Sequence, residues 1–393
     1  MEQPDPAGLK ATWSYPTTIL FGAGSLAKLP RACADAGIAR PLLVTDPGLA
    51  ELPPVGEALS VLRGAGLEPG LFTDLRPNPT AANVDAGLAA LRDGGHDGVV
   101  AMGGGSALDC GKAIAFMAGQ TRPIWDFEDV DDYWKRAREE GILPVVAIPT
   151  TAGTGSEVGR AAVITDPEIH TKKIIFHPRM LPRTAILDPR VTVGLPAHLT
   201  AATGMDALAH SLEAYCAPTF HPMSEGIAVE GMRLVKEALP RACAEGGDLA
   251  ARGMMLAASM MGAVAFQKGL GAIHALSHPI GALYDTHHGL TNAVLMPYVL
   301  AFNCRAVEAK IARLAGWLEL PRTDFGGFLD WVLGLRRELG IPHRLKDLGV
   351  APERFSTIAE MAVRDPTAAT NPVPLTAEGA ETILRQAYEG TGV

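Results

Sequence analysis

Several features that mark other protein classes are scarce or missing in this chain of 393 residues. It has five cysteines and no C-x-x-C pair, which argues against a disulfide framework and predicts reduced thiols. It has no basic run, and its net charge of −9 argues against nucleic acid as a partner. Internal repeats and low-complexity linkers are also missing.

Long apolar runs are scarce as well. The stretch 253–265 is too short and too interrupted by glycine to cross a membrane. The N-terminal residues are acidic and have no apolar core, so we expect no signal peptide and a cytoplasmic protein. The composition, 48% hydrophobic and 20% charged, is typical of a globular enzyme, and the length favours two domains.

The first half of the chain alternates strand-like and helix-like segments. Apolar runs of strand length lie at 42–45, 98–102 and 145–149, and helical patterns lie at 25–35, 54–65 and 80–92. This alternation predicts a doubly wound parallel sheet. We therefore expect an α/β nucleotide-binding domain over residues 1–194.

After Asp188-Pro189 the strand signals stop and helical periodicity takes over. The helical segments are 201–217, 222–238, 249–267, 305–318, 325–339 and 376–389. We place the domain junction at Leu195-Pro196 and predict an all-helical domain over residues 195–393.

Two glycine-rich segments are candidates for binding a nucleotide. The first, 22–27, has the form G-x-G-x-x-A, with Asp46 ending a later strand, but we favour a tight strand-to-helix turn there. The second, 99–112, runs from a buried strand through three glycines to Ser106, the expected N-cap of a helix. Glycines let a diphosphate approach the backbone, and a helix N-terminus attracts it, so this segment is the stronger candidate.

A hydroxyl-rich loop, 148–157, follows the third strand-like run. Such loops at the carboxyl ends of parallel strands line ligand crevices. Ser156 has the chemistry of a nucleophile, but the sequence places no base beside it. We favour helix capping by Ser156 with Glu157.

One acid and four histidines follow in the second half. Asp206 and His210 are four residues apart in an alanine-rich run, His274 and His278 are four apart further on, and His288 precedes a glycine. Residues four apart on a helix project from one face. A carboxylate and several imidazoles that converge from two helices suit a first-row transition metal. Unpaired burial of so many polar rings would be costly, so we favour a metal site over incidental histidines.

These motif regions together resemble the iron-dependent (group III) alcohol dehydrogenases, collinearly from about Trp13 to Tyr388. The resemblance implies a dehydroquinate synthase-like fold: an α/β dinucleotide-binding domain, a helical metal-binding domain, and the active site in the cleft between them. It implies hydride transfer between NAD(H) and a small primary alcohol or aldehyde. It also implies a homodimer or higher homo-oligomer.

Four of the five clustered residues match the metal ligands of that family: Asp206, His210, His274 and His288. The resemblance places His278 near the nicotinamide and the substrate, where it is the candidate for relaying the hydroxyl proton. Fe2+ rests on the resemblance, because these ligand types also suit Zn2+ and other divalent ions.

The resemblance assigns cofactor contacts in the first domain. The family pattern matches Gly103, Gly104, Gly105, Ser106, Asp109 and Lys112, and further matches are Asn78, Thr80, Thr150, Thr151, Thr154 and Lys172. Asp46 matches the acid at the adenosine ribose, where a carboxylate repels a 2′-phosphate, so NAD is expected over NADP. One departure is Gly159, where the family usually has a threonine that contacts the cofactor.

The substrate is less constrained. Lys268 and Arg160 make a carboxylate-bearing substrate such as 4-hydroxybutyrate conceivable, but we favour solvated or cofactor-contacting side chains and an uncharged alcohol or aldehyde. A dehydroquinate-synthase-like lyase would need a more cationic site than the Ala- and Leu-rich surroundings of His274 indicate. A non-catalytic NAD- or metal-binding protein has no support, because every ligand position is filled.

Overall fold

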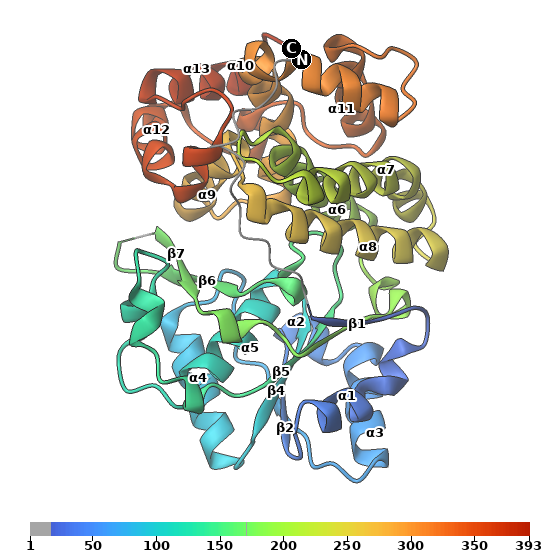
Figure 1. The fold of residues 1–393 in the computed structure, drawn as a ribbon, viewed down its shortest axis with the longest axis vertical. Helices are drawn as coiled ribbons and strands as arrows, with labels where there is room; N and C mark the ends of the chain where they lie inside the picture. The colour runs from blue at the N-terminus through green and yellow to red at the C-terminus, as the bar shows by residue number, and fades with distance from the viewer. Residues whose placement is uncertain (1–16, 170) are drawn as a thin grey trace. The chain divides into compact units, whose positions relative to one another are not determined.

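The computed structural model describes residues 17–169 and 171–393. The chain folds into two compact units, one spanning Pro16–Leu195 and the other containing Pro196–Val393. The start of the predicted first domain and Trp13, where the family resemblance begins, lie outside the described residues. The first unit is an α/β structure and the second is helical (Figure 1), so the predicted fold class is confirmed.

The α/β unit is built on a six-stranded sheet in which every pairing is parallel. In spatial order its strands are β1 (Thr18–Phe21), β8 (Thr184–Leu187), β5 (Val145–Pro149), β4 (Gly98–Gly103), β2 (Pro41–Val44) and β3 (Gly70–Phe72). β2, β4, β5 and β8 are buried at every residue. This explains their continuous apolar sequences, because a parallel sheet covered on both faces has no solvent side.

Helices cover both faces of this sheet (Figure 1). They are α1 (Leu29–Asp35), α2 (Pro47–Ala50), α3 (Pro53–Gly64), α4 (Ala81–Asp93) and α5 (Gly105–Met117). Side chains alternate along β4: Val99 and Ala101 join the core formed with α4 and α5, while Val100 and Met102 join the core formed with α1 and α3.

The winding of the sheet reverses between β2 and β4. The chain leaves β2 toward α3 on one face and leaves β4 into α5 on the other. Ligands of doubly wound sheets bind outside the carboxyl ends of the strands at such a switch point. Asp46 follows β2 and Gly103 ends β4, so two predicted cofactor residues lie at this position.

The segment 22–27 forms the tight strand-to-helix turn that its sequence favours. It follows β1 and leads through a short 3-10 turn, Ser25–Lys28, into α1. Ser25 Oγ donates to Gly22 O at 2.6 Å, and Leu26 N donates to Asp188 Oδ2 at 3.0 Å. Because β1 is an edge strand, this turn is separated from the switch point by β8, β5 and β4.

An antiparallel hairpin, β6 (Ala161–Asp166) and β7 (Thr171–Phe176), was not indicated by the sequence patterns. Most of β7 is only partly buried and includes two lysines, so it has no continuous apolar signal. Thr165 N donates to Pro79 O at 2.7 Å, and Lys172 lies opposite Thr165 in the hairpin register. The hairpin therefore holds the 78–80 loop close to Lys172.

The regular structure described in the second unit is helical. Its helices are α6 (Ala197–Cys216), α7 (Pro222–Ala244), α8 (Leu249–Ala265), α9 (Ala272–Tyr284), α10 (His288–Trp317), α11 (Phe325–Glu338), α12 (Phe355–Arg364) and α13 (Ala377–Glu389). α6, α7 and α8 lie side by side (Figure 1), and α6 also packs against α10. Every residue of α6 from Gly204 to Cys216 is buried, so this helix forms the centre of the unit.

Helix α10 begins much earlier than the segment 305–318 that its sequence periodicity indicates. It starts at His288, where the His287 Nδ1 caps it by accepting the Leu290 N–H at 3.4 Å, and it passes through Pro297. Residues 291–300 are all buried, so the first half of α10 has no amphipathic period, and its proline reads as a break.

One described segment, Leu249–Lys268, is long and apolar enough to cross a membrane by length and composition alone. It is longer than the stretch 253–265 on which the sequence expectation rested. In the structure 61% of its most apolar window is buried inside the unit, where α8 packs on α6 and α7. A place in the protein core therefore accounts for its composition.

Candidate functional site

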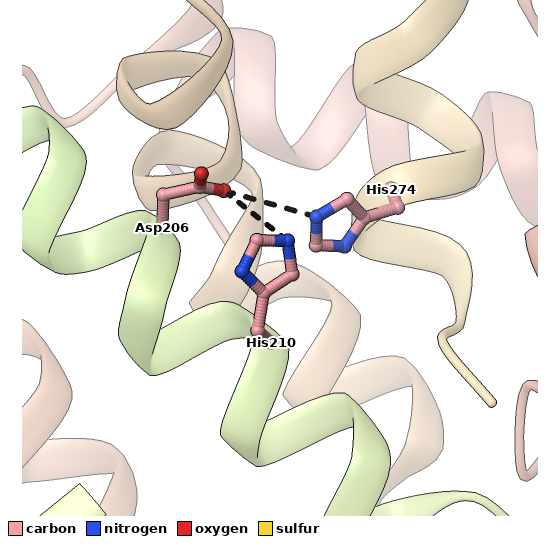
Figure 2. A group of neighbouring side chains, drawn as sticks. All are labelled: Asp206, His210 and His274. Atoms are coloured by element: carbon pink, nitrogen blue, oxygen red, sulfur yellow. Dashed lines mark ion pairs between the residues drawn. The ribbon is translucent and has the colours of Figure 1, made fainter. Parts of the chain in front are cut away.

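Helix α6 carries the first two residues of the candidate metal site. Asp206 and His210 lie one turn apart, and they are 2% and 5% exposed. Figure 2 shows both side chains directed toward His274 of α9. One ligand atom from each of these residues lies within 4.8 Å of the other two. Asp206 Oδ1 is 3.9 Å from His210 Nε2 and 3.8 Å from His274 Nε2.

His288 reaches the same carboxylate from α10, with its Nε2 3.7 Å from Asp206 Oδ1. The neighbouring glycine makes this approach feasible. A methyl group on Gly289 would lie 2.4 Å from Ala202 O, so only glycine lets the start of α10 come this close to the backbone of α6. The structure thus brings together the four residues that the sequence resemblance assigns to the metal.

Asp206 is held in its charged form. Burial raises the pKa of its carboxyl, but His210, His288 and His274, together with a hydrogen bond from Asn292, lower that pKa to about 2. A carboxylate buried among apolar helices requires a positive partner. The Asp206 carboxylate can therefore attract a cation.

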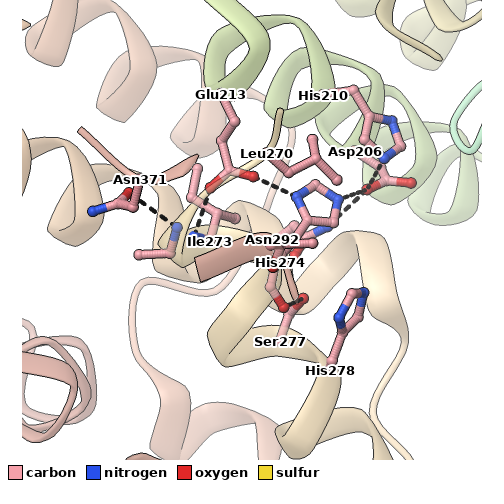
Figure 3. A network of polar contacts seen from close by, with 12 residues as sticks. Asp206, His210, Glu213, Leu270, Ile273, His274, Ser277, His278, Asn292 and Asn371 are labelled. Atoms are coloured by element: carbon pink, nitrogen blue, oxygen red, sulfur yellow. Dashed lines mark hydrogen bonds and ion pairs between the residues drawn. The ribbon is translucent and has the colours of Figure 1, made fainter. Parts of the chain in front are cut away.

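His274 is oriented by a second carboxylate (Figure 3). Its Nδ1 donates to Glu213 Oε2 at 2.5 Å, and Glu213 Oε1 accepts the Ile273 N–H at 2.7 Å. Because an ionised carboxylate only accepts, this bond keeps the proton of His274 on Nδ1 and directs the lone pair of Nε2 toward Asp206. Burial lowers the pKa of His274, but Glu213, Asp206 and Asp365 outweigh it, so that pKa lies above its usual value.

His278 is engaged differently from the other histidines. Its ring stacks on that of His288 with centroids 5.5 Å apart, and its Nδ1 donates to Asp365 Oδ2 at 2.8 Å. Asp365 Oδ1 in turn accepts from Thr367 N at 2.9 Å and from Thr367 Oγ1 at 2.6 Å. Burial raises the pKa of Asp365, but His278 and Thr367 lower it below its usual value, so Asp365 stays charged.

The residues present fit a divalent first-row ion. Imidazole nitrogens from α6, α9 and α10 lie 3.7 to 3.9 Å from one charged carboxylate oxygen, and Asp206, His210 and His274 also have ligand atoms within 4.8 Å of one another. Nitrogen and oxygen donors of this kind suit Fe and Zn. The lowered pKa of Asp206 keeps a negative charge at this point, and the raised pKa of His274 indicates that the carboxylates around its ring favour positive charge there.

The α/β unit brings the predicted ribose acid to the glycine-rich loop. Asp46 caps α2 through Oδ1, which accepts the Leu49 N–H at 2.9 Å. Its Oδ2 faces Gly103, where an added methyl group would lie 3.5 Å away. Gly103 has φ +148°, and the same methyl group would lie 2.7 Å from Ala107 Cβ, so this position accepts only glycine.

The hydroxyl-rich loop packs against the same glycines. Thr150 N donates to Gly103 O at 2.9 Å, and a methyl group on Gly105 would lie 2.7 Å from Thr154 Cγ2. Thr151 Oγ1 would lie 3.5 Å from a methyl group on Gly104. A bare backbone edge beside hydroxyl groups fits a diphosphate.

The N-cap expectation for Ser106 is wrong. α5 begins at Gly105 with Gly104 as its N-cap, and no side chain caps it. Gly104 enters the helix from an extended backbone, so Ser106 falls inside the first turn. The N–H groups at a helix N-terminus that lacks a side-chain cap are suited to an anion.

Asp109 and Lys112 form a buried network within the unit. Ser156 Oγ donates to Asp109 Oδ1 at 2.5 Å, and Val163 N donates to Asp109 Oδ2 at 2.9 Å. Lys112 Nζ lies 3.1 Å from Asp109 Oδ1 and donates to Ser156 O at 3.1 Å. The expectation that Ser156 caps a helix is therefore wrong, because its hydroxyl ties the loop to α5. Both carboxylate oxygens of Asp109 are bonded to the protein, and its contact with a cofactor stays a prediction.

Gly159, which departs from the family pattern, lies beside this network. A methyl group there would lie 3.5 Å from Ser156 O and 3.6 Å from Lys112 Nζ, both ordinary contacts. The structure therefore has room for a Cβ atom at this position, and packing does not require glycine. The missing hydroxyl is a chemical difference rather than a steric one.

Lys268 is buried, which contradicts both sequence interpretations of it. Its side chain is 0% exposed, and its Nζ donates to the carbonyls of Ala214, Tyr215 and Ala217 and pairs with Glu225 at 3.1 Å. These carbonyls end α6, where a cation compensates the helix dipole. Lys268 is therefore a structural cap. Burial and Lys310 lower its pKa to about 8.

Comparison with known proteins identifies the family. A family model described as iron-containing alcohol dehydrogenase matches residues 16–189, and one described as Fe-containing alcohol dehydrogenase family, C-terminal, matches residues 200–388. The chain belongs to the iron-containing alcohol dehydrogenase family. It is therefore an oxidoreductase of a metal-dependent class, and the resemblance read from its motifs is confirmed.

Individual members of this iron-containing alcohol dehydrogenase family match along nearly the whole chain. The 4-hydroxybutyrate dehydrogenase of Cupriavidus necator is 39% identical over 382 residues, covering 95% of this chain and 98% of that protein. The crystal structure of a 1,3-propanediol oxidoreductase has a TM-score of 0.91 and 36% identity, covering 96% of this chain and 100% of that one. Sulfoacetaldehyde reductase from Bifidobacterium kashiwanohense, in complex with NAD+, has a TM-score of 0.88 and 30% identity, covering 97% and 100%.

Sequence reasoning missed three residues that contact the clustered acid and histidines. Glu213 lies two turns after Asp206 on α6, and Asn292 one turn after His288 on α10, so helical spacing could have found both. Asp365 is 87 residues from His278, and no local pattern connects them.

Glu157 is a buried carboxyl whose contribution to the free energy of unfolding depends on pH. Burial raises its pKa to about 7, against the opposing effects of its own backbone hydrogen bond and of Lys112. Because the folded-state pKa lies above the unfolded value of 4.5, its stabilising contribution is present below pH 4.5. That contribution is lost as the pH rises toward 7.

We predict that Glu157→Gln gains stability relative to the parent protein as the pH rises. The raised pKa of Glu157 corresponds to a free energy on the order of 3 kcal/mol. The free energy of unfolding of the variant, relative to that of the parent, should rise by about this amount between low and high pH. Urea unfolding of both at pH 5 and at pH 8 measures it. A difference that is the same at the two pH values would show that Glu157 is ionised throughout.

For Glu213 we predict that replacement by Gln weakens metal binding by about tenfold to a hundredfold, because the charge that orients and polarises His274 is removed. Chelator competition on the metal-free protein measures the affinity. Glu230→Gln, an exposed carboxylate paired with Arg233 on α7, serves as the control and should leave it unchanged. Equal affinities in the parent and both variants would contradict the role of Glu213.

Proposed function

We propose that this chain transfers a hydride between NAD(H) and a small primary alcohol or aldehyde, at a divalent metal ion held by Asp206, His210, His274 and His288. The observation that carries the proposal is the convergence of three imidazole Nε2 atoms on one charged carboxylate oxygen, at 3.7 to 3.9 Å. Fe2+ is the proposed ion, with Zn2+ as the alternative, because the chain belongs to the iron-containing family.

Each of the two proposed domains has one role. Residues 1–194 bind the dinucleotide and residues 195–393 hold the metal. Support for the first assignment comes from the glycine edge at Gly103, which lies at the switch point of the sheet, and from a similar reductase solved with NAD+. Asp46 favours NAD over NADP, because its free carboxylate oxygen faces that edge and would repel a 2′-phosphate.

The metal supplies Lewis-acid polarisation of the substrate oxygen, and the nicotinamide exchanges the hydride. The residues of the chain supply the geometry. Glu213 orients the His274 ring, and Gly289 admits His288 to within 3.7 Å of Asp206. The surrounding helices keep Asp206, His210 and His274 nearly free of water, which strengthens electrostatic interactions there.

His278 is the proposed residue for handling the hydroxyl proton. Asp365 accepts the proton on its Nδ1, so its Nε2 is the atom left to receive or release one. The bonds from Thr367 fix Asp365 in turn. In this arrangement His278 has the position of a general base, and Asp365 is the carboxylate that selects the tautomer of its imidazole ring.

The proposed substrate is an uncharged alcohol or aldehyde. Lys268 is the cationic side chain nearest in sequence to His274 and His278, so it is the candidate partner for a substrate carboxylate. Its ammonium group is bonded to the end of α6 instead. The runner-up is a hydroxy acid such as 4-hydroxybutyrate, which the similarity to the Cupriavidus necator dehydrogenase supports.

We also propose that the enzyme acts in the cytoplasm as a homodimer or higher homo-oligomer, without nucleic acid or membrane partners. The five free cysteines and the net charge of −9 support the compartment and the absence of a nucleic-acid partner.

The test is NAD+ reduction by the protein loaded with Fe2+ or Zn2+, over a panel of primary alcohols, diols and 4-hydroxybutyrate. We expect turnover with uncharged alcohols, and we expect His274→Ala to lose both bound metal and turnover. His198→Ala, which removes an exposed histidine of α6, should retain both. Full activity of His274→Ala would rule out the metal assignment, and turnover of 4-hydroxybutyrate alone would establish the runner-up.

Asp365→Asn should lower kcat by about tenfold to a hundredfold, less than the 10²–10⁴ that a complete general acid or base contributes. The reason is that the His278 tautomer is no longer enforced. Metal content should stay unchanged, because Asp365 contacts His278 and not the four ligand residues in the hydrogen bonds described above. Plasma emission spectroscopy and the pH profile of kcat measure the two effects. Loss of metal in this variant would contradict the separation of roles.

A further inference from the structure

Asn292 occupies a position among the proposed ligands that no role yet explains. It lies one turn after His288 on α10 and is 0% exposed. Its Nδ2 donates to Asp206 Oδ1 at 2.7 Å and lies 3.2 Å from His274 Nε2 and 3.2 Å from His288 Nε2. Figure 3 shows the bond from this side chain to Asp206 as a dashed line beside His274. A single amide therefore contacts three of the four atoms that would bind the metal.

The NH2 group of this amide has hydrogen-bond partners, and its carbonyl oxygen has none in the described part of the chain. Its NH2 group faces the Asp206 carboxylate oxygen and the lone pair of His274 Nε2, because the Nδ1 proton of His274 goes to Glu213. Its carbonyl oxygen, Oδ1, is buried and has no hydrogen-bond partner among residues 17–169 and 171–393. A buried carbonyl without a partner is unfavourable, so this orientation of Asn292 is maintained by the NH2 contacts alone.

The opposite orientation becomes favourable only with a cation. Rotating the amide by half a turn would put Oδ1 in the place of Nδ2, which is 2.7 Å from Asp206 Oδ1. Without an ion, this oxygen would face the Asp206 carboxylate oxygen and the lone pair of His274 Nε2, both of them acceptors. With a divalent ion among them, the oxygen is attracted and the NH2 group no longer faces positive charge.

We propose that Asn292 is a fifth partner of the metal, and that its amide reverses with occupancy. In the metal-free protein the NH2 group holds Asp206, His274 and His288 together. In the loaded protein Oδ1 faces the ion. This inference rests on the proposed function, because it requires the metal centre.

The added oxygen has a consequence for metal choice. Zn2+ is most often four-coordinate and tetrahedral, whereas harder ions accept more ligands and prefer oxygen. An amide oxygen beside the Asp206 carboxylate raises both the coordination number and the share of oxygen donors. Asn292 therefore favours Fe2+ over Zn2+.

A simpler role is that the NH2 group only orients Asp206. Two substitutions separate the roles. Asn292→Leu keeps the size of the side chain and removes both the oxygen and the NH2 group. Asn292→Asp keeps an oxygen donor and removes the NH2 group. Asn303→Leu is the matched control, because Asn303 is a buried amide on the same helix that pairs with Asn371, at 2.9 and 2.8 Å.

The experiment measures Fe2+ affinity (anaerobically) and Zn2+ affinity by chelator competition, on the metal-free full-length protein and each variant. We expect Asn292→Leu to lose about tenfold or more in Fe2+ affinity and less in Zn2+ affinity. Asn292→Asp should bind Fe2+ at least as tightly as the parent. Its metal-free form should melt at a lower temperature, because two carboxylates then face each other. Asn303→Leu should lower the melting temperature and leave the ratio of the two affinities unchanged.

Several results would overturn the inference. Equal losses of Fe2+ affinity in Asn292→Leu and Asn292→Asp would show that only the NH2 group matters. Unchanged affinity in Asn292→Leu, or the same shift in Asn303→Leu, would remove the assignment to Asn292. If Asn292→Leu does not fold, the visible spectrum of the Co2+-loaded parent decides: weak five-coordinate bands support a fifth ligand, and intense tetrahedral bands overturn it. A parent protein that binds no metal would instead contradict the proposed function.

Discussion

Asp206 places a negative charge where water does not reach, and the helical unit is organised to keep it there. Its carboxylate is 2% exposed, and its pKa is lowered to about 2 by residues on three helices. α6 supplies the charge, α9 and α10 bring imidazoles to it, and Glu213 and Asn292 bond to those imidazoles or to the carboxylate itself. An isolated buried charge would destabilise the unit, so a bound cation and the packing of these helices support one another.

The buried charged residues have different kinds of partner in the two units. In the helical unit the buried charges face one another across a common point. In the α/β unit, Asp109 and Lys112 are paired within the protein and fasten the Thr150 loop and the β6–β7 hairpin to α5. Asp109 and Lys112, which the family resemblance groups with the cofactor contacts, are thus bonded to the neighbouring loop and hairpin. Lys268 is a similar case, since its charge stabilises the end of α6.

Much of the fold was predictable because its signals are local. Buried strands such as β4 are continuous apolar runs, and α6 follows from its alanine-rich sequence. The β6–β7 hairpin and the first half of α10 were missed, since one is only partly buried and the other is buried on all sides. For the site, spacing of four residues identified the pairs that begin at Asp206 and His274, and their role as ligands stays a prediction. Asp365 could not be found, because its contact with His278 exists only after folding.

The contact between Gly289 and Ala202 O joins main chain to main chain, without any side chain between. Residue 289 contributes no donor atom, but its size sets how far His288 lies from Asp206 on another helix. Any mutation that adds even a methyl group there must push the two helices apart and separate the two ligands without changing either one. A substitution at position 289 would therefore change the surroundings of Asp206 as directly as a substitution of the histidine that precedes it.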